Sequence, residues 1–327
     1  MRFTLKSLLL LIFTFPLYAQ ERNETATLLK NAEEMLFSDP EQSVRIGEHI
    51  IKNTTTEYEM GLAALFASKS YHIQGDYIKA VEYFNTANLL LKNTQNKELY
   101  IQSLLHTADM YSQLDLTEIK NENLSIANAI VENNIAFQEL LHDYYLLADS
   151  TNSFSSLVKN ISFENELKYP FAQIDEGSLQ TRLANSSLAS GHYDDALKYY
   201  TQALINIRKT SNNEYWEMKA LLCFSDYFFN KKEYQKAIDT LNKALETGIK
   251  FKNPHFLNSA YSKLSATYLA LDNNEQYQHF SQKTNIVAAD MEIQKTRAIN
   301  SVFNILQNEQ NNVVLNAEKN QKINLHV

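Results

Sequence analysis

The sequence predicts an all-α protein, a solenoid of helix-turn-helix repeats followed by a long C-terminal helix. Three observations lead to this expectation. The 327 residues include only 6 Gly and 4 Pro, about 3% of the chain where roughly 12% is usual, so tight β-turns and glycine-rich loops must be scarce. Apolar residues recur at helical spacing along most of the chain. One short pattern also occurs three times in register, which is typical of a repeat protein.

Residues 1–19 have the layout of a secretory signal peptide. Arg2 and Lys6 supply positive charge, the stretch from Leu8 to Phe15 is apolar, and Ala19 provides a small residue at the end. A membrane-spanning helix needs about 20 apolar residues, more than this stretch offers. We therefore expect cleavage after Ala19, no stable membrane insertion afterwards, and a periplasmic or secreted location.

The charge balance and the cysteine count exclude several classes of function. The chain has 30 Lys+Arg against 38 Asp+Glu, a formal net charge of −8. Sequence-independent binding of nucleic acid requires a basic surface that displaces counterions, so we expect no nucleic-acid partner. The single cysteine, Cys223, rules out an intramolecular disulfide and a cysteine-based zinc site.

The repeated pattern occupies residues 75–87, 191–203 and 232–244. In each segment an aromatic residue is followed three positions later by alanine, four positions after that by a large apolar residue, and three positions later by a second alanine. This spacing places all four on one face of a helix, with alanine wherever a neighbouring helix must approach closely. The first two members of each set are Tyr77 and Ala80, Tyr193 and Ala196, and Tyr234 and Ala237.

This pattern resembles the second helix of a tetratricopeptide repeat (TPR). The first-helix signature, a small residue three positions before an aromatic one, is present as Ser68/Tyr71, Ala108/Tyr111, Ser225/Phe228 and Ser265/Tyr268. The resemblance implies a TPR-like right-handed α-solenoid over residues 20–284, with about seven repeats starting near 24, 61, 101, 138, 177, 218 and 258. The pattern is clearest in the repeats at 61, 177 and 218, whereas 138–170 keeps little beyond helical periodicity. The intervals exceed the standard 34 residues, which implies longer helices or loops.

After residue 284 the repeat pattern stops. Residues 285–306 carry apolar side chains at helical spacing, among them Ile286, Met291 and Val302. We expect one long helix here that caps the last repeat, because the end of a solenoid needs a helix with one polar face. Residues 307–327 are rich in Asn, Gln and Lys, and we expect this polar tail to fray or to be disordered.

The sequence offers no recognisable catalytic or metal-binding motif. It contains none of H-E-x-x-H, G-x-S-x-G, G-x-x-x-x-G-K and C-x-x-C, and its eight histidines are scattered. Cys223 lies between Leu222 and Phe224, with no base or electropositive setting visible, so we interpret it as a small core residue. We expect no catalytic residue, no cofactor and no metal.

The TPR resemblance implies a concave groove lined by positions 2, 5, 9 and 12 of each first helix. On this sequence those positions include the candidate peptide-binding residues Lys69, His72, Asp109, Asn185, Lys219 and Asp226. The family's clamp of Lys, Asn and Arg for a peptide C-terminal carboxylate is not reproduced. Leu65 and Lys69 stand where Lys and Asn belong, and Thr181 replaces the Lys expected beside Asn185.

The sequence therefore favours an exported, non-enzymatic scaffold that binds a peptide or protein in its groove. The alternative is the sensory input module of a TPR-type transcriptional regulator or signalling protein, truncated before its transmembrane helix and output domain. The signal peptide, the long repeats and the polar C-terminal helix resemble the periplasmic input regions of such regulators in Bacteroidetes-type bacteria. An in-frame apolar run of about 20 codons beyond Val327 would favour this alternative. An enzyme is the least favoured hypothesis, because solenoids lack the strand-to-loop sites where catalytic groups usually sit.

Overall fold

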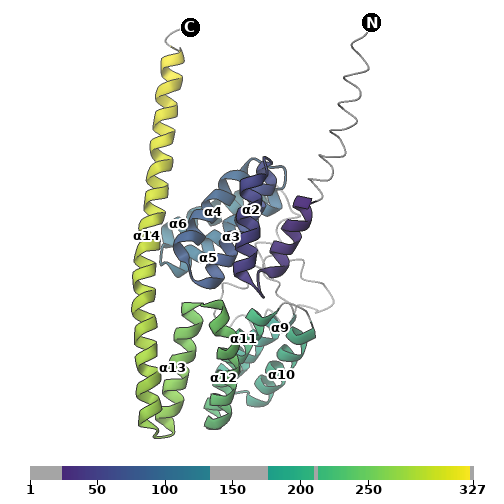
Figure 1. Ribbon diagram of the computed structural model, residues 1–327, viewed down its shortest axis with the longest axis vertical. Helices are drawn as coiled ribbons and strands as arrows, with labels where there is room; N and C mark the ends of the chain where they lie inside the picture. The colour runs from purple at the N-terminus through teal and green to yellow at the C-terminus, as the bar shows by residue number, and fades with distance from the viewer. Residues whose placement is uncertain (1–23, 133–175, 210–212, 325–327) are drawn as a thin grey trace.

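The computed structural model describes residues 24–132, 176–209 and 213–324, and the described chain is helical with short turns and no strand (Figure 1). The expected signal peptide and the repeat expected near residue 138 lie outside the described residues. Residues 24–35 form the first described helix. The N-terminal half then contains α2 (Pro40–Asn53), α3 (Glu57–Gln74), α4 (Tyr77–Lys92), α5 (Lys97–Gln113) and α6 (Thr117–Glu132). The C-terminal half contains α9 (Glu176–Ala189), α10 (Tyr193–Lys209), α11 (Glu214–Asn230), α12 (Tyr234–Phe251) and α13 (Pro254–Ala270), and α14 (Asn274–Asn324) follows.

These helices stack as a solenoid. Each first helix packs against the second helix of its own repeat, as α3 does on α4, α9 on α10, α11 on α12 and α13 on α14. First helices of neighbouring repeats also contact one another, since α3 touches α5, and α11 touches both α9 and α13. The first helices therefore form one layer within each half. This arrangement confirms the prediction of an all-α solenoid of TPR-like helix pairs.

The same turn joins the two helices of five repeats. Its central residue has a positive φ, 78° at Gly75 and 75° at Gly191. The residue after it donates its N–H back across the turn, as Asp76 does to the carbonyl of Tyr71 at 2.9 Å. This is the Schellman arrangement, which satisfies the last carbonyls of a helix. The other three turns of this kind have Asp115, Lys232 and Asp272 at the positive φ.

The alanines of the repeated pattern pack where the sequence predicts. Ala80, Ala196 and Ala237 are all fully buried, and so are the second alanines of the same three segments. The large apolar residues between them, Phe84 and Tyr200 for example, are at most 1% exposed. Because a methyl group allows neighbouring helices to approach closely, substitution of these alanines by larger residues would overpack the repeat.

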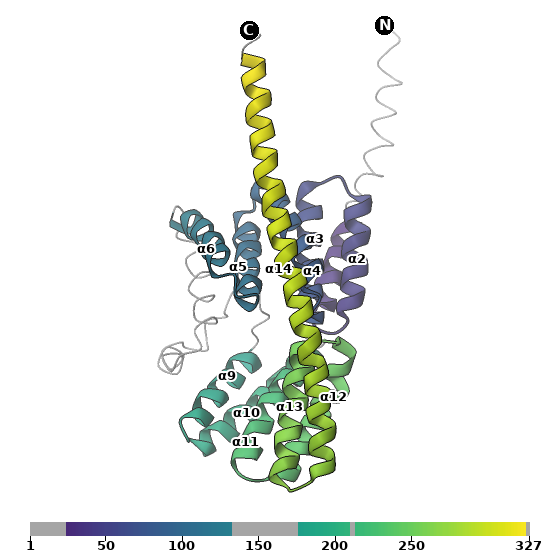
Figure 2. The same ribbon diagram turned by 90° about the vertical axis from the view of Figure 1, so that its left-hand side faces the viewer.

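The C-terminal helix is longer than the expected capping helix at 285–306, and it does more than cap the last repeat. It begins at Asn274 and continues to Asn324, so residues 307–324, expected to fray, are helical. Figure 2 shows it running along both halves and projecting beyond the N-terminal one. Ala298 and Val302 are buried in the core of the N-terminal half, where α14 contacts α4. Burial of apolar residues on two successive halves stabilises this helix as far as Leu306.

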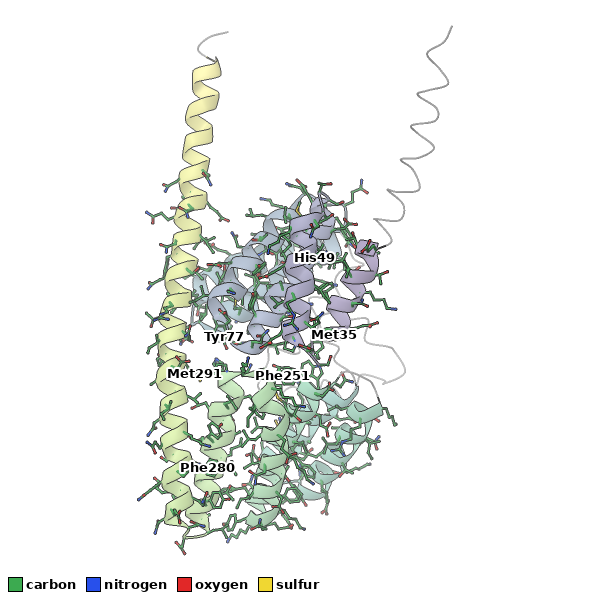
Figure 3. The ribbon with its side chains drawn as sticks, viewed as in Figure 1. Met35, His49, Tyr77, Phe251, Phe280 and Met291 are labelled. Atoms are coloured by element: carbon green, nitrogen blue, oxygen red, sulfur yellow. The ribbon has the colours of Figure 1, made fainter. Side chains whose placement is uncertain are left out.

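The two halves also touch each other directly. One hydrophobic cluster combines Leu36, Phe37 and Ile73 with residues of α10 to α13, and the ring of Phe37 lies 5.3 Å from that of Trp216. The side chain of Asn253 donates a buried 2.6 Å hydrogen bond to the carbonyl of Ile73. Tyr77 and Phe251, labelled in Figure 3, lie near this meeting of the halves. None of the described helices is long and apolar enough to cross a membrane.

Candidate functional site

The six residues proposed from the sequence lie on first helices, and we call their surroundings the first-helix surface. It comprises the polar side chains of α3, α5, α9, α11 and α13, namely Lys69, His72, Asp109, Gln113, Arg182, Asn185, Lys219, Cys223, Asp226 and Lys263. Asp109, Asn185 and Lys219 are exposed to solvent, whereas His72 and Asp226 are half-buried. Lys69 differs from the rest, because its side chain is only 8% exposed. Five of the six predicted residues are therefore accessible to a ligand.

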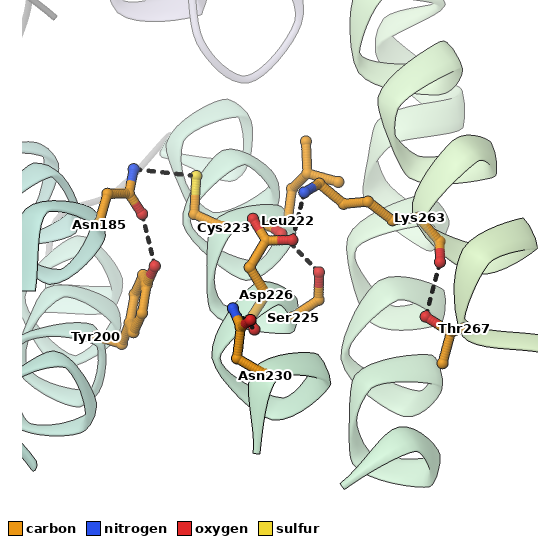
Figure 4. Close-up of polar contacts among 9 residues, drawn as sticks. All are labelled: Asn185, Tyr200, Leu222, Cys223, Ser225, Asp226, Asn230, Lys263 and Thr267. Atoms are coloured by element: carbon orange, nitrogen blue, oxygen red, sulfur yellow. Dashed lines mark hydrogen bonds and ion pairs between the residues drawn. The ribbon is translucent and has the colours of Figure 1, made fainter. Parts of the chain in front are cut away.

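A line of polar contacts crosses α9, α11 and α13 (Figure 4). The hydroxyl of Tyr200 donates to Oδ1 of Asn185 at 2.6 Å, which fixes the orientation of the amide. Its Nδ2 then faces Sγ of Cys223 at 3.6 Å. Further along, Asp226 forms an ion pair with Lys263. Since sulfur is a weak acceptor, the amide group of Asn185 retains most of its capacity to donate.

Asp109 connects the two halves electrostatically. It lies on α5, yet its carboxylate is near enough to Lys219 on α11 and Arg182 on α9 to favour the charged form of both. Tyr215 has the largest effect on the pKa of the Lys219 ammonium, which it raises. The ammonium lies over the ring of Tyr215, 5.2 Å from the ring centroid. Burial lowers the pKa of Arg182, against the effect of Asp109. Side chains from far apart in the sequence thus form one polar surface.

Lys69 has a different environment from the one predicted for it. Burial lowers the pKa of its ammonium to about 8, and the more distant charge of Glu33 offsets only part of this effect. Burial also lowers the pKa of His106 well below its usual value, and Lys69 adds to this. Because Lys69 is buried, it can influence a ligand on the first-helix surface through its charge but offers little area for direct contact.

His72 belongs to a small hydrogen-bonded group. Its Nε2 lies 3.0 Å from Oε1 of Gln113, which also accepts from the hydroxyl of Tyr77 at 3.2 Å. The Nε2 of Gln113 donates to Asp109 at 3.2 Å. Gln113 therefore links two of the predicted residues, His72 and Asp109, which lie on different helices.

Sequence reasoning missed several members of this surface. Arg182, Gln113 and Lys263 were not proposed, and neither was His255, whose ring lies 5.4 Å from that of Tyr77 in an edge-on arrangement. Helical spacing could have placed Gln113 beside Asp109, because the two are four residues apart. No local signal could have placed His255 near His72, because that proximity depends on how the halves meet.

The first-helix surface offers hydrogen-bonding and charged groups to a ligand. Cys223 is half-buried rather than fully in the core, and burial raises the pKa of its thiol, which disfavours the reactive thiolate. Among the described residues, no cluster of histidine, cysteine or acidic side chains could hold a metal ion. A depression of about 570 Å³ is lined by Asn121 to Glu132 of α6 alone, away from the first-helix surface. What remains is a surface of hydrogen-bond donors and acceptors with charges of both signs.

No protein-family model matches this chain, and no curated protein does. Three solved structures share part of its helical arrangement. BtubC (BKLC) from P. vanneervenii is 12% identical over 78% of this chain and 93% of its own, with a TM-score of 0.32. A Rap protein complexed with competence and sporulation factor is 13% identical, with 76% and 80% covered and a TM-score of 0.45. NprR in complex with its cognate peptide NprX is 12% identical, with 91% and 79% covered and a TM-score of 0.39. At TM-scores below 0.5, these likenesses add nothing to what the helix pairs of this chain show.

Proposed function

We propose that this protein is an exported, non-enzymatic helical-repeat scaffold that binds a peptide or protein segment across the first-helix surface. One observation carries the proposal. Exposed polar side chains from both halves lie together on this surface, with Asp109 electrostatically coupled to Lys219 and Arg182.

A peptide suits this surface better than a small molecule. The surface extends over first helices of both halves, and solenoids commonly bind extended chains along such layers. A peptide backbone presents carbonyl acceptors and N–H donors at every residue. The amide of Asn185, oriented by Tyr200, can exchange the weak sulfur acceptor of Cys223 for a backbone carbonyl, which accepts hydrogen bonds more strongly.

The proposal is tested by selecting peptides from a displayed random library and measuring their affinity by fluorescence anisotropy. Replacing Asn185 or Asp109 by Ala is expected to weaken binding about two- to tenfold each, since one hydrogen bond contributes roughly 0.5–1.5 kcal/mol. The matched control is Lys243→Ala, an exposed change on α12. Enrichment of no peptide by the folded protein, or equal losses in the control, would contradict the proposal.

Export is tested separately. The apolar stretch and basic start of residues 1–19 support cleavage after Ala19. Mass spectrometry of the protein made in its native host should give an N-terminus at Gln20. An intact Met1 in a protein retained inside the cell would refute this part of the proposal and leave the binding part standing.

A further inference from the structure

Positively charged and histidine side chains gather where the two halves meet. His72 at the end of α3 and His255 at the start of α13 both pack against Tyr77, with ring centroids 5.7 and 5.4 Å from it. The buried hydrogen bond from Asn253 to the carbonyl of Ile73 joins the start of α13 to the end of α3, next to these two histidines. Two histidines from distant repeats are thus kept close by the packing of the halves.

Two lysines complete the group. Burial lowers the pKa of the His255 ring, and the positive charges of His72, Lys295 and Lys219 lower it further. The ammonium of Lys219 lies over the rings of Tyr215 and Trp216, at 5.2 and 5.6 Å. His255 also lies in the first turn of α13, where the helix dipole favours negative charge. Like charges held so close raise the local positive potential, although the whole chain has a formal charge of −8.

Two acidic groups face these cations, Asp115 at Lys295 and Asp109 near Lys219, and each offsets part of the positive charge. Asp115 is already paired with Lys295, and Asp109 accepts a hydrogen bond from Gln113. Lys219 has no carboxylate at ion-pair distance among the described residues. On the α3 side, the ammonium of Lys69 adds positive charge, whereas burial keeps the ring of His106 neutral by lowering its pKa well below the usual value. The excess of positive charge in the cluster therefore depends on its histidines and grows as they are protonated.

We propose that His72, His255 and Lys219 bind the carboxylate groups of an acidic peptide, and that binding tightens as the histidines take up protons. This inference rests on the proposed function, because it names the class of peptide that the first-helix surface accepts. The sign of the pH effect follows from linkage. A bound carboxylate favours the imidazolium form, so binding takes up protons and strengthens as the pH falls towards the histidine range.

The test measures binding of fluorescein-labelled hexaglutamate and hexaglutamine by anisotropy between pH 8 and pH 6 at constant ionic strength. Glutamate stays ionised over this range. Hexaglutamate should bind, and its affinity should rise about tenfold from pH 8 to pH 6, the change expected for an average uptake of about half a proton over these two pH units. Hexaglutamine should bind more weakly at both values. The only tryptophan in the chain is Trp216, and its fluorescence should change on binding because Lys219 lies over its ring.

Two variants separate the roles. The double substitution His72→Gln with His255→Gln should abolish the pH dependence, whereas Lys219→Gln should lower affinity at every pH and leave the pH dependence in place. Lys243→Gln on the exposed side of α12 is the matched control and should change neither. Circular dichroism and thermal melting of each variant confirm that it is folded.

Three results would overturn the inference. They are equal affinity for the two hexapeptides, an unchanged pH dependence in the folded double histidine variant, and a Trp216 response to sulfate that hexaglutamate does not reproduce. The last would indicate a site for small inorganic anions only. Library peptides that bind without any preference for acidic residues would also overturn it, and would leave the proposed function itself intact.

Discussion

Gly75 and Gly191 occupy the same turn in two repeats and provide a matched pair. Their φ values are 78° and 75°, so alanine at either site meets the same backbone penalty of roughly 1–2 kcal/mol. Their surroundings differ. A Cβ at Gly75 would lie 2.1 Å from Cδ and 2.6 Å from Cγ of Pro254, whereas a Cβ at Gly191 meets nothing within 4 Å. Only Gly75 lies against the opposite half.

The difference between the two substitutions therefore measures how tightly the halves are joined. Relief of the overlap at Gly75 requires Pro254 to move, and with it the neighbouring Asn253 that donates to Ile73. Overpacking costs about 1–3 kcal/mol and loss of that buried hydrogen bond about 1 kcal/mol. We expect Gly191→Ala to destabilise the protein by about 1–2 kcal/mol and Gly75→Ala by about 3–6 kcal/mol, the sums of these contributions.

Urea unfolding followed by circular dichroism measures both free energies of unfolding. Adding Pro254→Ala to the Gly75→Ala variant should recover part of the loss, because the ring atoms in the overlap are removed, and the coupling follows from a double-mutant cycle. Equal destabilisation by the two glycine substitutions, within about 0.5 kcal/mol, would refute the contact between the α3–α4 turn and the start of α13.

Three further predictions concern the junction and the buried lysine. Asn253→Ala should destabilise the protein by about 2 kcal/mol in urea unfolding, because it removes both the cap of α13 and the buried bond to Ile73. Lys69→Met should raise the stability at pH 7 by about 3 kcal/mol, because folding lowers the pKa of this ammonium from 10.5 to about 8. Ala298→Asp should lower the free energy of unfolding by several kcal/mol, because it buries a carboxylate without a partner. Ala289→Asp, on the exposed side of α14, should change it by less than about 0.5 kcal/mol.

The pH dependence of the lysine prediction has a definite sign. A lysine whose pKa falls on folding binds fewer protons in the folded state than in the unfolded state between about pH 8 and its ordinary value. Its contribution therefore makes the wild type more stable as the pH rises through this window, and the advantage of Lys69→Met should shrink from pH 7 to pH 9.5. An advantage that is constant over this range would contradict the burial of this ammonium.

The repeat architecture could be predicted from the sequence because its signals are local and periodic. Ala80, Ala196 and Ala237 recur in the same pattern, and each is fully buried as predicted. Helical periodicity and small residues at close approaches are properties of a dozen consecutive positions. The positions of Lys219, Asp109 and the other site candidates on first helices followed from the same register.

The length of α14 was not predicted, since the polar composition of residues 307–327 outweighed other signals. The structure continues the helix to Asn324, past Ala298 and Val302, which pack on the core of the N-terminal half. Cys223 was placed in the core from its apolar neighbours, yet it lies half-buried beside Asn185. The apolar residues adjacent to Cys223 in the sequence do not reveal that part of its side chain is exposed.

The sequence by itself determined the helices, the turns between them and the residues that face a neighbouring helix, because these depend on spacing within one or two turns. Only the tertiary structure decided which first helices face each other. Asp109 acts on Arg182 and Lys219, and both His72 and His255 pack against Tyr77. These residues are far apart in the chain. Their proximity depends on the accumulated rotation of successive repeats and on the apolar contact that joins the two halves.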